Sequence, residues 1–382
     1  MEGETTARSD AAGTKLPWVD VAKGLGILLV ALGHLTSGDG EGVWLPALDE
    51  LHYALYLFHM PLFFFLGGVV LHVRGRDFGS FARRRARGLL VPYYAFSLYY
   101  LLKPVALALA PSLGESLAVE GTQDLATSAF DVLVMGEGLW FLWAYFWGQL
   151  LAFLVLRALA GPDDEGAGER GHVLACALVG VLLVLASQLW WTVGPEVKLP
   201  LCLLRGMEAG GYILLGVALR EALARVPRWA LVPLALALAV ALGLVAHRVM
   251  PDLYVTQEYV ALFPDGESPA LSLAVLQAAL MLLLALAGTL AVAFLSLALG
   301  ECGPLRELGR RSLVLYALSA PSMNLCKLLL FSLAGVDLHD APFAAQLGVG
   351  VLLALASVLV LVPVERLIRR HLPFLLGRRR ER

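Results

Sequence analysis

Apolar stretches long enough to cross a lipid bilayer recur along this chain of 382 residues. A transmembrane helix needs about 20 consecutive apolar residues, and a transmembrane strand about ten with alternating polarity. The chain is 59% hydrophobic and 16% charged, whereas about 25% of the residues in soluble domains are charged. We predict an all-α integral membrane protein with about ten transmembrane helices, at residues 17–36, 54–73, 88–110, 138–160, 173–193, 199–219, 229–247, 269–298, 312–334 and 343–364.

The distribution of basic residues predicts how these helices are oriented. Cytoplasmic loops of membrane proteins carry an excess of Lys and Arg. With the N-terminal segment inside, the inner segments hold 23 of the 29 Lys and Arg, and the outer loops hold two, against 16 Asp and Glu. We expect both termini to be cytoplasmic, with a short segment at 1–16, a membrane domain at 17–365 and a basic tail at 366–382. Topology alone can explain each Arg cluster.

Three ionisable residues lie in the first membrane-length segment: Asp20, Lys23 and His34. The spacing of eleven positions from Lys23 to His34 places both on one helix face, roughly 16 Å apart along the axis. Asp20 lies one turn from Lys23, within pairing distance. Charges inside a bilayer are costly and usually face a cavity or the protein interior. The alternatives are that Lys23 extends to the inner surface and that His34 faces an outer loop.

Two further segments contain candidate site residues. His59 lies among aromatic residues at 56–71, where an interfacial aromatic belt is the alternative explanation. An Arg-rich run at 81–94, which we expect to join two helices, contains Arg84 and Arg87, and guanidinium groups can bind phosphate in a bidentate manner. The sequence contains no CxxC motif or His-rich tract. We therefore expect neither a metal site nor a nucleic-acid partner.

Arg205 and Glu208 are spaced one turn apart in an apolar segment, 199–219. Residues three apart share a helix face, and single charges at this depth are unfavourable. We predict that the two side chains pair with each other, or with Lys23 across a cavity.

Several of these stretches resemble the acyltransferase-3 family of polytopic bacterial acyltransferases. The first helix of that family has a basic residue and a His separated by ten positions, as in DVAKGLGILLVALGHL, with Lys23 and His34. The second helix is similar to FHMPLFFFLGG, although Ser often stands where Gly67 is. An RxxR element before a Pro-Tyr helix start resembles ARRRARGLLVPYY, with Arg84 and Arg87.

Later segments extend the resemblance to the ninth predicted helix. GLWFLWAYFWGQLL is similar to the family's fourth helix, and LGRRSLVLYALSAP is similar to its late element, which contains Tyr316. Members commonly carry a His three residues after that Tyr, and here the position holds Ser319. A hydroxyl cannot act as a base near neutral pH. The closest likeness is to the fucose-4-O-acetylase-like subgroup of carbohydrate O-acetyltransferases.

The resemblance implies transfer of an acyl group, usually acetyl, to a hydroxyl of a carbohydrate, glycolipid or glycoside at a bacterial inner membrane. Acetyl-CoA would be the co-substrate, with no bound cofactor. Lys23, Arg84 and Arg87 would bind the donor, and His34 would act either as general base or as acyl carrier. The other candidate site residues are Asp20, His59, Arg205, Glu208 and Tyr316. The rival interpretations are a transporter or flippase for a lipid-linked sugar, and an inactive homologue in which Ser319 marks lost chemistry.

Overall fold

The computed structural model describes residues 16–35, 44–102, 105, 124–160, 169–193, 199–249 and 270–377. Within these ranges the chain forms helices, turns and connecting segments, and no strands, in agreement with the predicted all-α class. Most of the predicted N-terminal segment, part of the basic tail, the end of the predicted span at 88–110, about half of the outer loop at 111–137 and most of the outer loop at 248–268 lie outside the described residues.

Seven helices in the described part of the chain are long and apolar enough to cross a membrane. They run over Pro46–Val69, Leu125–Leu159, Gly171–Val193, Pro200–Arg225, Arg228–Arg248, Leu271–Leu299 and Phe343–His371. Each overlaps one of the ten predicted spans. The chain is therefore an all-α multi-pass membrane protein, whereas the count of ten and the location of both termini stay predictions.

Of the other three predicted spans, two begin or end differently from the sequence-based boundaries. Helix α1 (Pro17–Gly33) ends one residue before His34. Helix α3 (Phe78–Ser97) begins ten residues before the predicted span at 88–110. Asp77 explains this early start, because its side chain accepts the backbone N–H of Ser80 at 2.8 Å and caps the helix. The expectation that the Arg-rich run is a connection was wrong, since it forms part of α3.

The predicted span at 312–334 is not one helix. It is divided into α13 (Ser312–Ala317), α14 (Ser319–Lys327) and a π-helical turn at Leu328–Leu333. Pro321 explains the first break, because proline lacks a backbone N–H and its ring clashes with the carbonyl four residues earlier. The sequence-based prediction missed this effect because hydropathy was averaged over the whole segment.

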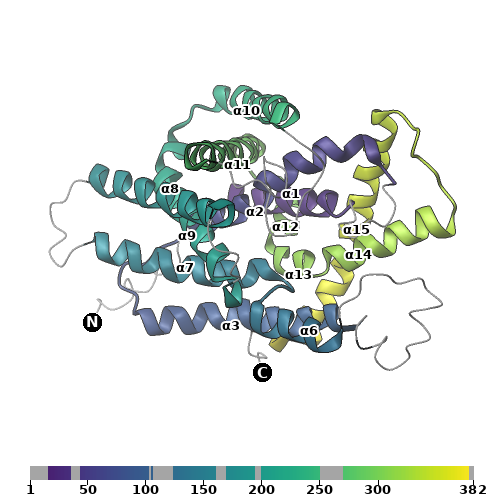
Figure 1. Ribbon diagram of the computed structural model, residues 1–382, viewed down its shortest axis with the longest axis horizontal. Coiled ribbons are helices and arrows are strands. Elements are labelled where there is room, and N and C mark those ends of the chain that lie inside the picture. The colour runs from purple at the N-terminus through teal and green to yellow at the C-terminus, as the bar shows by residue number, and fades with distance from the viewer. Residues whose placement is uncertain are drawn as a thin grey trace, which may run out of the picture.

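The remaining helices surround α1 and α2, which lie near the centre of the molecule (Figure 1). Helix α2 packs against α9 and α11, α9 packs against α7 and α8, and α10 packs on α11. Their bounds are α2 (Asp49–Val69), α6 (Leu125–Phe130), α7 (Trp140–Leu159), α8 (Glu169–Val193), α9 (Leu203–Arg225), α10 (Arg228–Val249), α11 (Leu271–Leu299), α12 (Gly303–Arg310) and α15 (Phe343–His371).

Helix α12 lies directly on the first half of α1. A Cβ atom at Gly24 would overlap the backbone carbonyl of Leu305, and one at Gly309 would overlap that of Asp20. Only glycine permits backbones to approach this closely. The contact fixes the short α12, which carries Arg310 at its last position, against the predicted cytoplasmic end of α1.

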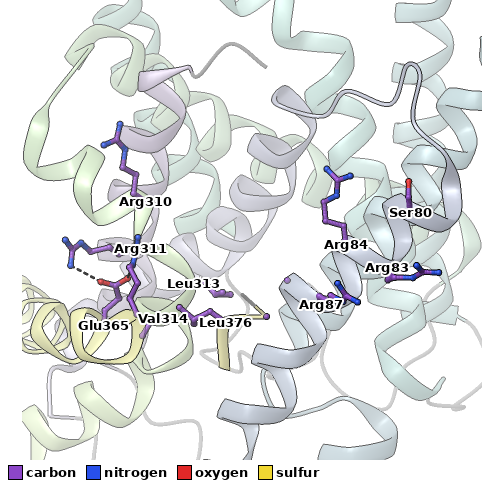
Figure 2. Close-up of a pocket in the computed structure, with 13 residues that line it drawn as sticks. Ser80, Arg83, Arg84, Arg87, Arg310, Arg311, Leu313, Val314, Glu365 and Leu376 are labelled. Atoms are coloured by element: carbon purple, nitrogen blue, oxygen red, sulfur yellow. Dashed lines mark hydrogen bonds and ion pairs between the residues drawn. The ribbon is translucent and has the colours of Figure 1, made fainter. Parts of the chain in front are cut away.

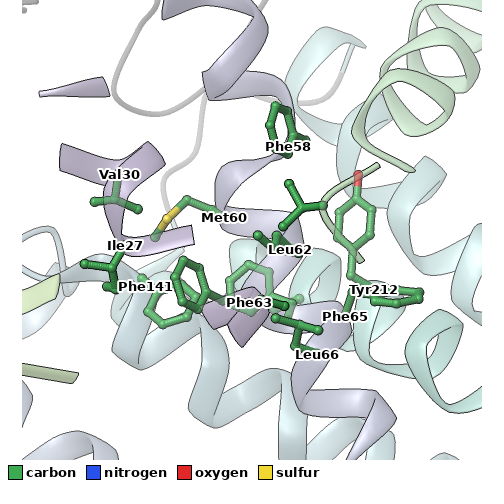
Figure 3. Packing of buried hydrophobic residues seen from close by; sticks show 14 of the residues in the cluster. Ile27, Val30, Phe58, Met60, Leu62, Phe63, Phe65, Leu66, Phe141 and Tyr212 are labelled. Atoms are coloured by element: carbon green, nitrogen blue, oxygen red, sulfur yellow. The ribbon is translucent and has the colours of Figure 1, made fainter. Parts of the chain in front are cut away.

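Aromatic side chains fill the centre of the bundle (Figure 3). Phe141 of α7 lies with its ring centre 5.9 Å from Phe63, 4.8 Å from Phe64 and 5.5 Å from Tyr145. Paired rings at these separations stabilise beyond the area that they bury. This cluster joins α2 to α7 at the level where α1 passes.

Candidate active site

A basic pocket with a volume of about 540 Å³ opens between α3, α12, α13 and α15. Six arginines line it: Arg83, Arg84, Arg87, Arg310, Arg311 and Arg369. All six come from segments predicted to be cytoplasmic. Figure 2 shows the α3 arginines on one side and the Arg311–Glu365 pair on the other, so the pocket has two walls.

The first wall is the exposed face of α3. The spacing of Arg83, Arg84 and Arg87 over little more than one turn places the three side chains on one side of the helix. Ser80, one turn earlier in α3, also lines the pocket. The predicted donor-binding residues Arg84 and Arg87 therefore both line this pocket.

The second wall was not predicted from the sequence. Glu365 of α15 is 1% exposed and accepts hydrogen bonds from Arg311 Nη1 at 2.8 Å and from Arg369 Nε at 2.7 Å. Arg311 also donates from Nε to Glu307 at 2.8 Å. This hydrogen bond is the main reason why the pKa of Glu307 is lowered from its usual value. From the sequence these arginines were interpreted only as topology signals, because the contact that brings them together, Arg311 with Glu365, joins residues 54 positions apart.

A chain of ion pairs joins the pocket to α1. Arg310 Nε lies 3.4 Å from Asp20 Oδ2, and Lys23 Nζ lies 4.0 Å from Asp20 Oδ1. The spacing-based pairing of Asp20 with Lys23 is thus present in the structure. Lys23 also lies within electrostatic range of Arg85, so the inner half of α1 continues the positive lining of the pocket.

His34 follows the last residue of α1, where its backbone N–H bonds to the carbonyls of Val30 and Ala31, both at 3.2 Å. His59 of α2 and Lys327 of α14 both act electrostatically on the His34 imidazole. The structure therefore brings the two predicted histidines into one neighbourhood, which we call the histidine site.

The orientation of His59 is fixed by its hydrogen bond. Its Nδ1 atom lies 2.7 Å from the carbonyl oxygen of Leu55. A carbonyl can only accept, so Nδ1 carries the proton, and in the neutral ring Nε2 carries the lone pair. The Tyr56 ring packs edge-on against the imidazole at 4.9 Å, and the Tyr56 hydroxyl donates to the carbonyl of Gly33 at 3.4 Å.

Lys327 is a component of the histidine site that the sequence analysis missed. Its side chain is 4% exposed, and its Nζ lies over the Trp44 ring, 5.5 Å from the ring centre. Trp44 in turn stacks on Phe331 at 5.2 Å. A Lys within an apolar segment was the available signal, the same one that identified Lys23.

Arg205 and Glu208 have separate contacts. The Arg205 guanidinium lies over the Trp140 ring, 4.4 Å from its centre, and Glu208 accepts a hydrogen bond from the Gln188 amide at 3.0 Å. The predicted pairing of the two charges stays a prediction. The Tyr316 ring lies 5.1 Å from that of Phe141 and within electrostatic range of Arg205.

The two departures from the family pattern have local explanations. Ser319 is 1% exposed, and its hydroxyl donates to the backbone carbonyl of Tyr316 at 2.8 Å, across the break between α13 and α14. A Cβ atom at Gly67 would overlap the Tyr145 hydroxyl, so a Ser at this position would require Tyr145 to move. Gly67 thus permits close packing of α2 on Tyr145, and Ser319 stabilises the turn between α13 and α14.

In the ranges that the structure describes, no cluster of three or more His, Cys, Asp or Glu could hold a metal ion.

Comparison with known proteins assigns the chain to a family. A family model described as an acyltransferase domain matches residues 16–364. The chain is also similar to the nodulation protein NolL of Mesorhizobium japonicum, with 29% identity over 147 residues. That match covers 37% of this chain and 35% of NolL, so it spans about a third of each protein. No solved structure matches. The near-complete match to the family model shows that this chain belongs to the acyltransferase-3 family.

Proposed function

We propose that this chain is a membrane O-acyltransferase. It transfers an acyl group, most simply acetyl, from acyl-CoA at the cytoplasmic face of a bacterial inner membrane to a hydroxyl of a carbohydrate, glycolipid or other glycoside. The observation that carries the proposal is the basic pocket of about 540 Å³ with its six arginines, which suits a ligand with several phosphate charges. Membership of the acyltransferase-3 family supports the reaction class.

His34 is the proposed general base. A hydroxyl is a poor nucleophile near pH 7 and requires a positioned base, for which an imidazole is suited. In the proposed reaction the hydroxyl oxygen attacks the thioester carbonyl, and His34 accepts the hydroxyl proton. The C–S bond then breaks, and the proton passes from the imidazole to the departing CoA thiolate.

Two neighbours of His34 support this chemistry. Lys327 acts electrostatically on His34, and a buried ammonium beside the reacting atoms stabilises the negative charge that develops on the thioester carbonyl oxygen. His59 has its Nδ1 proton bound to Leu55, so Nε2 can accept a hydrogen bond from the acceptor hydroxyl.

The experiment that tests the proposal combines a purified enzyme with a cellular measurement. Protein in detergent is incubated with acetyl-CoA and candidate glycan acceptors, and released CoA thiol is measured. Surface glycans from cells with and without the gene are compared by mass spectrometry. We expect acceptor-dependent thiol release, and acetyl-sized mass losses when the gene is removed. CoA binding without thiol release would indicate an inactive homologue. Loss of a whole glycan at the cell surface would favour a transporter or flippase.

A further inference from the structure

One wall of the basic pocket contains a carboxylate, Glu365, whereas the other charged residues that line the pocket are arginines. Glu365 is 1% exposed and lines the pocket together with Arg311 and Arg369. A buried carboxylate is unfavourable unless it is paired and hydrogen-bonded. Its location beside a site suited to anions therefore requires an explanation.

The hydrogen bonds of Glu365 hold two arginines from different helices. Arg311 Nη1 donates to one carboxylate oxygen at 2.8 Å, and Arg369 donates to the other from Nε at 2.7 Å and also from Nη2. A guanidinium is planar and has five N–H donors in fixed directions. When one edge is bound to Glu365, the direction of the remaining donors is fixed as well. Arg369 is 42% exposed, so its remaining donors are accessible.

The opposite wall is built differently. Figure 2 shows Arg83, Arg84 and Arg87 on α3, across the pocket from the Arg311–Glu365 pair. All three α3 side chains are on a solvent-exposed face, and long exposed arginines sample several rotamers. The pocket thus combines a wall that is held in place by a carboxylate with a wall of exposed side chains.

Resting on the proposed function, we infer that Glu365 is a positioning residue for the acyl donor. It holds Arg311 and Arg369 in the arrangement that binds the phosphate groups of acyl-CoA, while the α3 arginines contact the same ligand from the other side. Glu365 acts through the two arginines and touches neither the thioester nor the acceptor.

Loss of Glu365 should change the affinity for the donor in the direction opposite to the one that charge alone predicts. Removal of a negative charge makes the pocket more positive, and charge alone would then strengthen the binding of an anion. If Glu365 positions the arginines, its loss lets the Arg369 side chain regain rotamer freedom that binding must remove, and leaves Arg311 held by Glu307 without its contact to α15. Binding of the donor then becomes weaker.

The test compares full-length wild type with Glu365→Gln and Glu365→Asp in detergent. Calorimetry measures CoA binding, and steady-state kinetics give KM and kcat for acetyl-CoA. We expect Glu365→Gln to raise both the Kd for CoA and the KM about tenfold, which corresponds to about 1.4 kcal/mol, with kcat within about threefold. Glu365→Asp, which keeps the charge, should give an intermediate Kd. If a substitution only reduced the amount of folded protein, calorimetry would show fewer binding sites per chain and an unchanged Kd for CoA.

The matched control is Glu301→Gln. Glu301 also pairs with an arginine, Arg306, at 3.1 Å, but it is exposed and lies outside the pocket, so the Kd for CoA should not change. If Glu365→Gln gives no monodisperse protein, Glu365→Asp makes the comparison, because it shortens the side chain at unchanged charge. Unchanged or tighter CoA binding by the folded Glu365 variants overturns the inference and leaves the proposed function intact. Wild-type protein that does not bind CoA overturns the donor assignment itself, and this inference with it.

Discussion

The cations of the basic pocket and those of the interior are stabilised in two different ways. In the pocket, Arg311 and Arg369 bind the Glu365 carboxylate. In the interior, Lys327 lies over Trp44, and Arg205 lies over Trp140. An aromatic face attracts a cation through its π electrons, whereas a carboxylate binds defined N–H donors of a guanidinium and so fixes the direction of the others. We infer that the carboxylate-held arginines hold an anion in a defined place, and that the aromatic rings position the interior cations beside the proposed reaction site.

The largest expected effect comes from removing the base. His34→Ala should insert normally and lower acyl-transfer turnover by about 10²-fold or more, because general-base catalysis contributes at least that much. Turnover and folded concentration are measured on the same purified sample. The matched control is His72→Ala, which changes an exposed histidine after α2. Activity of His34→Ala within a few-fold of wild type would remove His34 from the catalytic role.

The next effect tests the exposed wall of the pocket. The double variant Arg84→Gln, Arg87→Gln should raise KM for acetyl-CoA about thirtyfold, as expected if each charge contributes about 1 kcal/mol of ground-state binding, with a smaller change in kcat. The control is Arg74→Gln, Arg76→Gln, which removes the same charge from an exposed segment outside the pocket. An equal rise in KM in both double variants would show that the total positive charge of this surface, and not contact within the pocket, controls donor binding.

Replacement of the interior cation near His34 should affect the chemical step. Lys327→Met is expected to lower kcat about tenfold, or about 1.4 kcal/mol in the barrier, with KM for acetyl-CoA unchanged. Lys327→Arg should restore part of the rate because it keeps the charge. If Lys327→Met raised the KM for acetyl-CoA and left kcat unchanged, Lys327 would act in donor binding. The proposed difference in role between the interior and the pocket would then be wrong.

The smallest expected effect concerns the second aromatic-held cation. Arg205→Gln, Glu208→Gln should remain folded, because Glu208 already has a neutral partner in Gln188. We expect a several-fold loss of turnover, since a cation–π contact of this kind is worth about 0.5–2 kcal/mol. The assay compares variant and wild type at equal folded concentration. Near-wild-type turnover would show that Arg205 and Glu208 serve packing alone.

Local patterns in the sequence were sufficient for the fold class and for part of the site. The length of an apolar segment can be read from consecutive residues of the sequence. The one-turn spacing of Asp20 and Lys23 and the clustering of Arg84 and Arg87 are local features of the same kind. These features reappear in the structure as membrane-length helices, an ion pair at 4.0 Å and two residues in one pocket wall.

The missed features depend on contacts between distant segments. Glu365 lies 54 residues from Arg311, and neither position indicates the other in the sequence. Lys327 lies at the end of α14, after the break that Pro321 introduces, and acts electrostatically on His34 at the end of α1, far away in the sequence. Hydropathy averages across such a break, so a single span at 312–334 was predicted in place of three short elements.

The close contact of α12 with α1 also determines where the reaction takes place across the membrane. Asp20, which binds Arg310 of the pocket, and His34 are separated by fourteen residues of α1 and its end, or about 21 Å at 1.5 Å per residue. The hydrocarbon core of a bilayer is about 30 Å thick. On the proposed function and the predicted orientation, the acyl group leaves its carrier roughly two thirds of the way toward the outer face. Group transfer would then be vectorial, because the acyl group would enter from the cytoplasmic face on CoA and leave on an acceptor nearer the outer face.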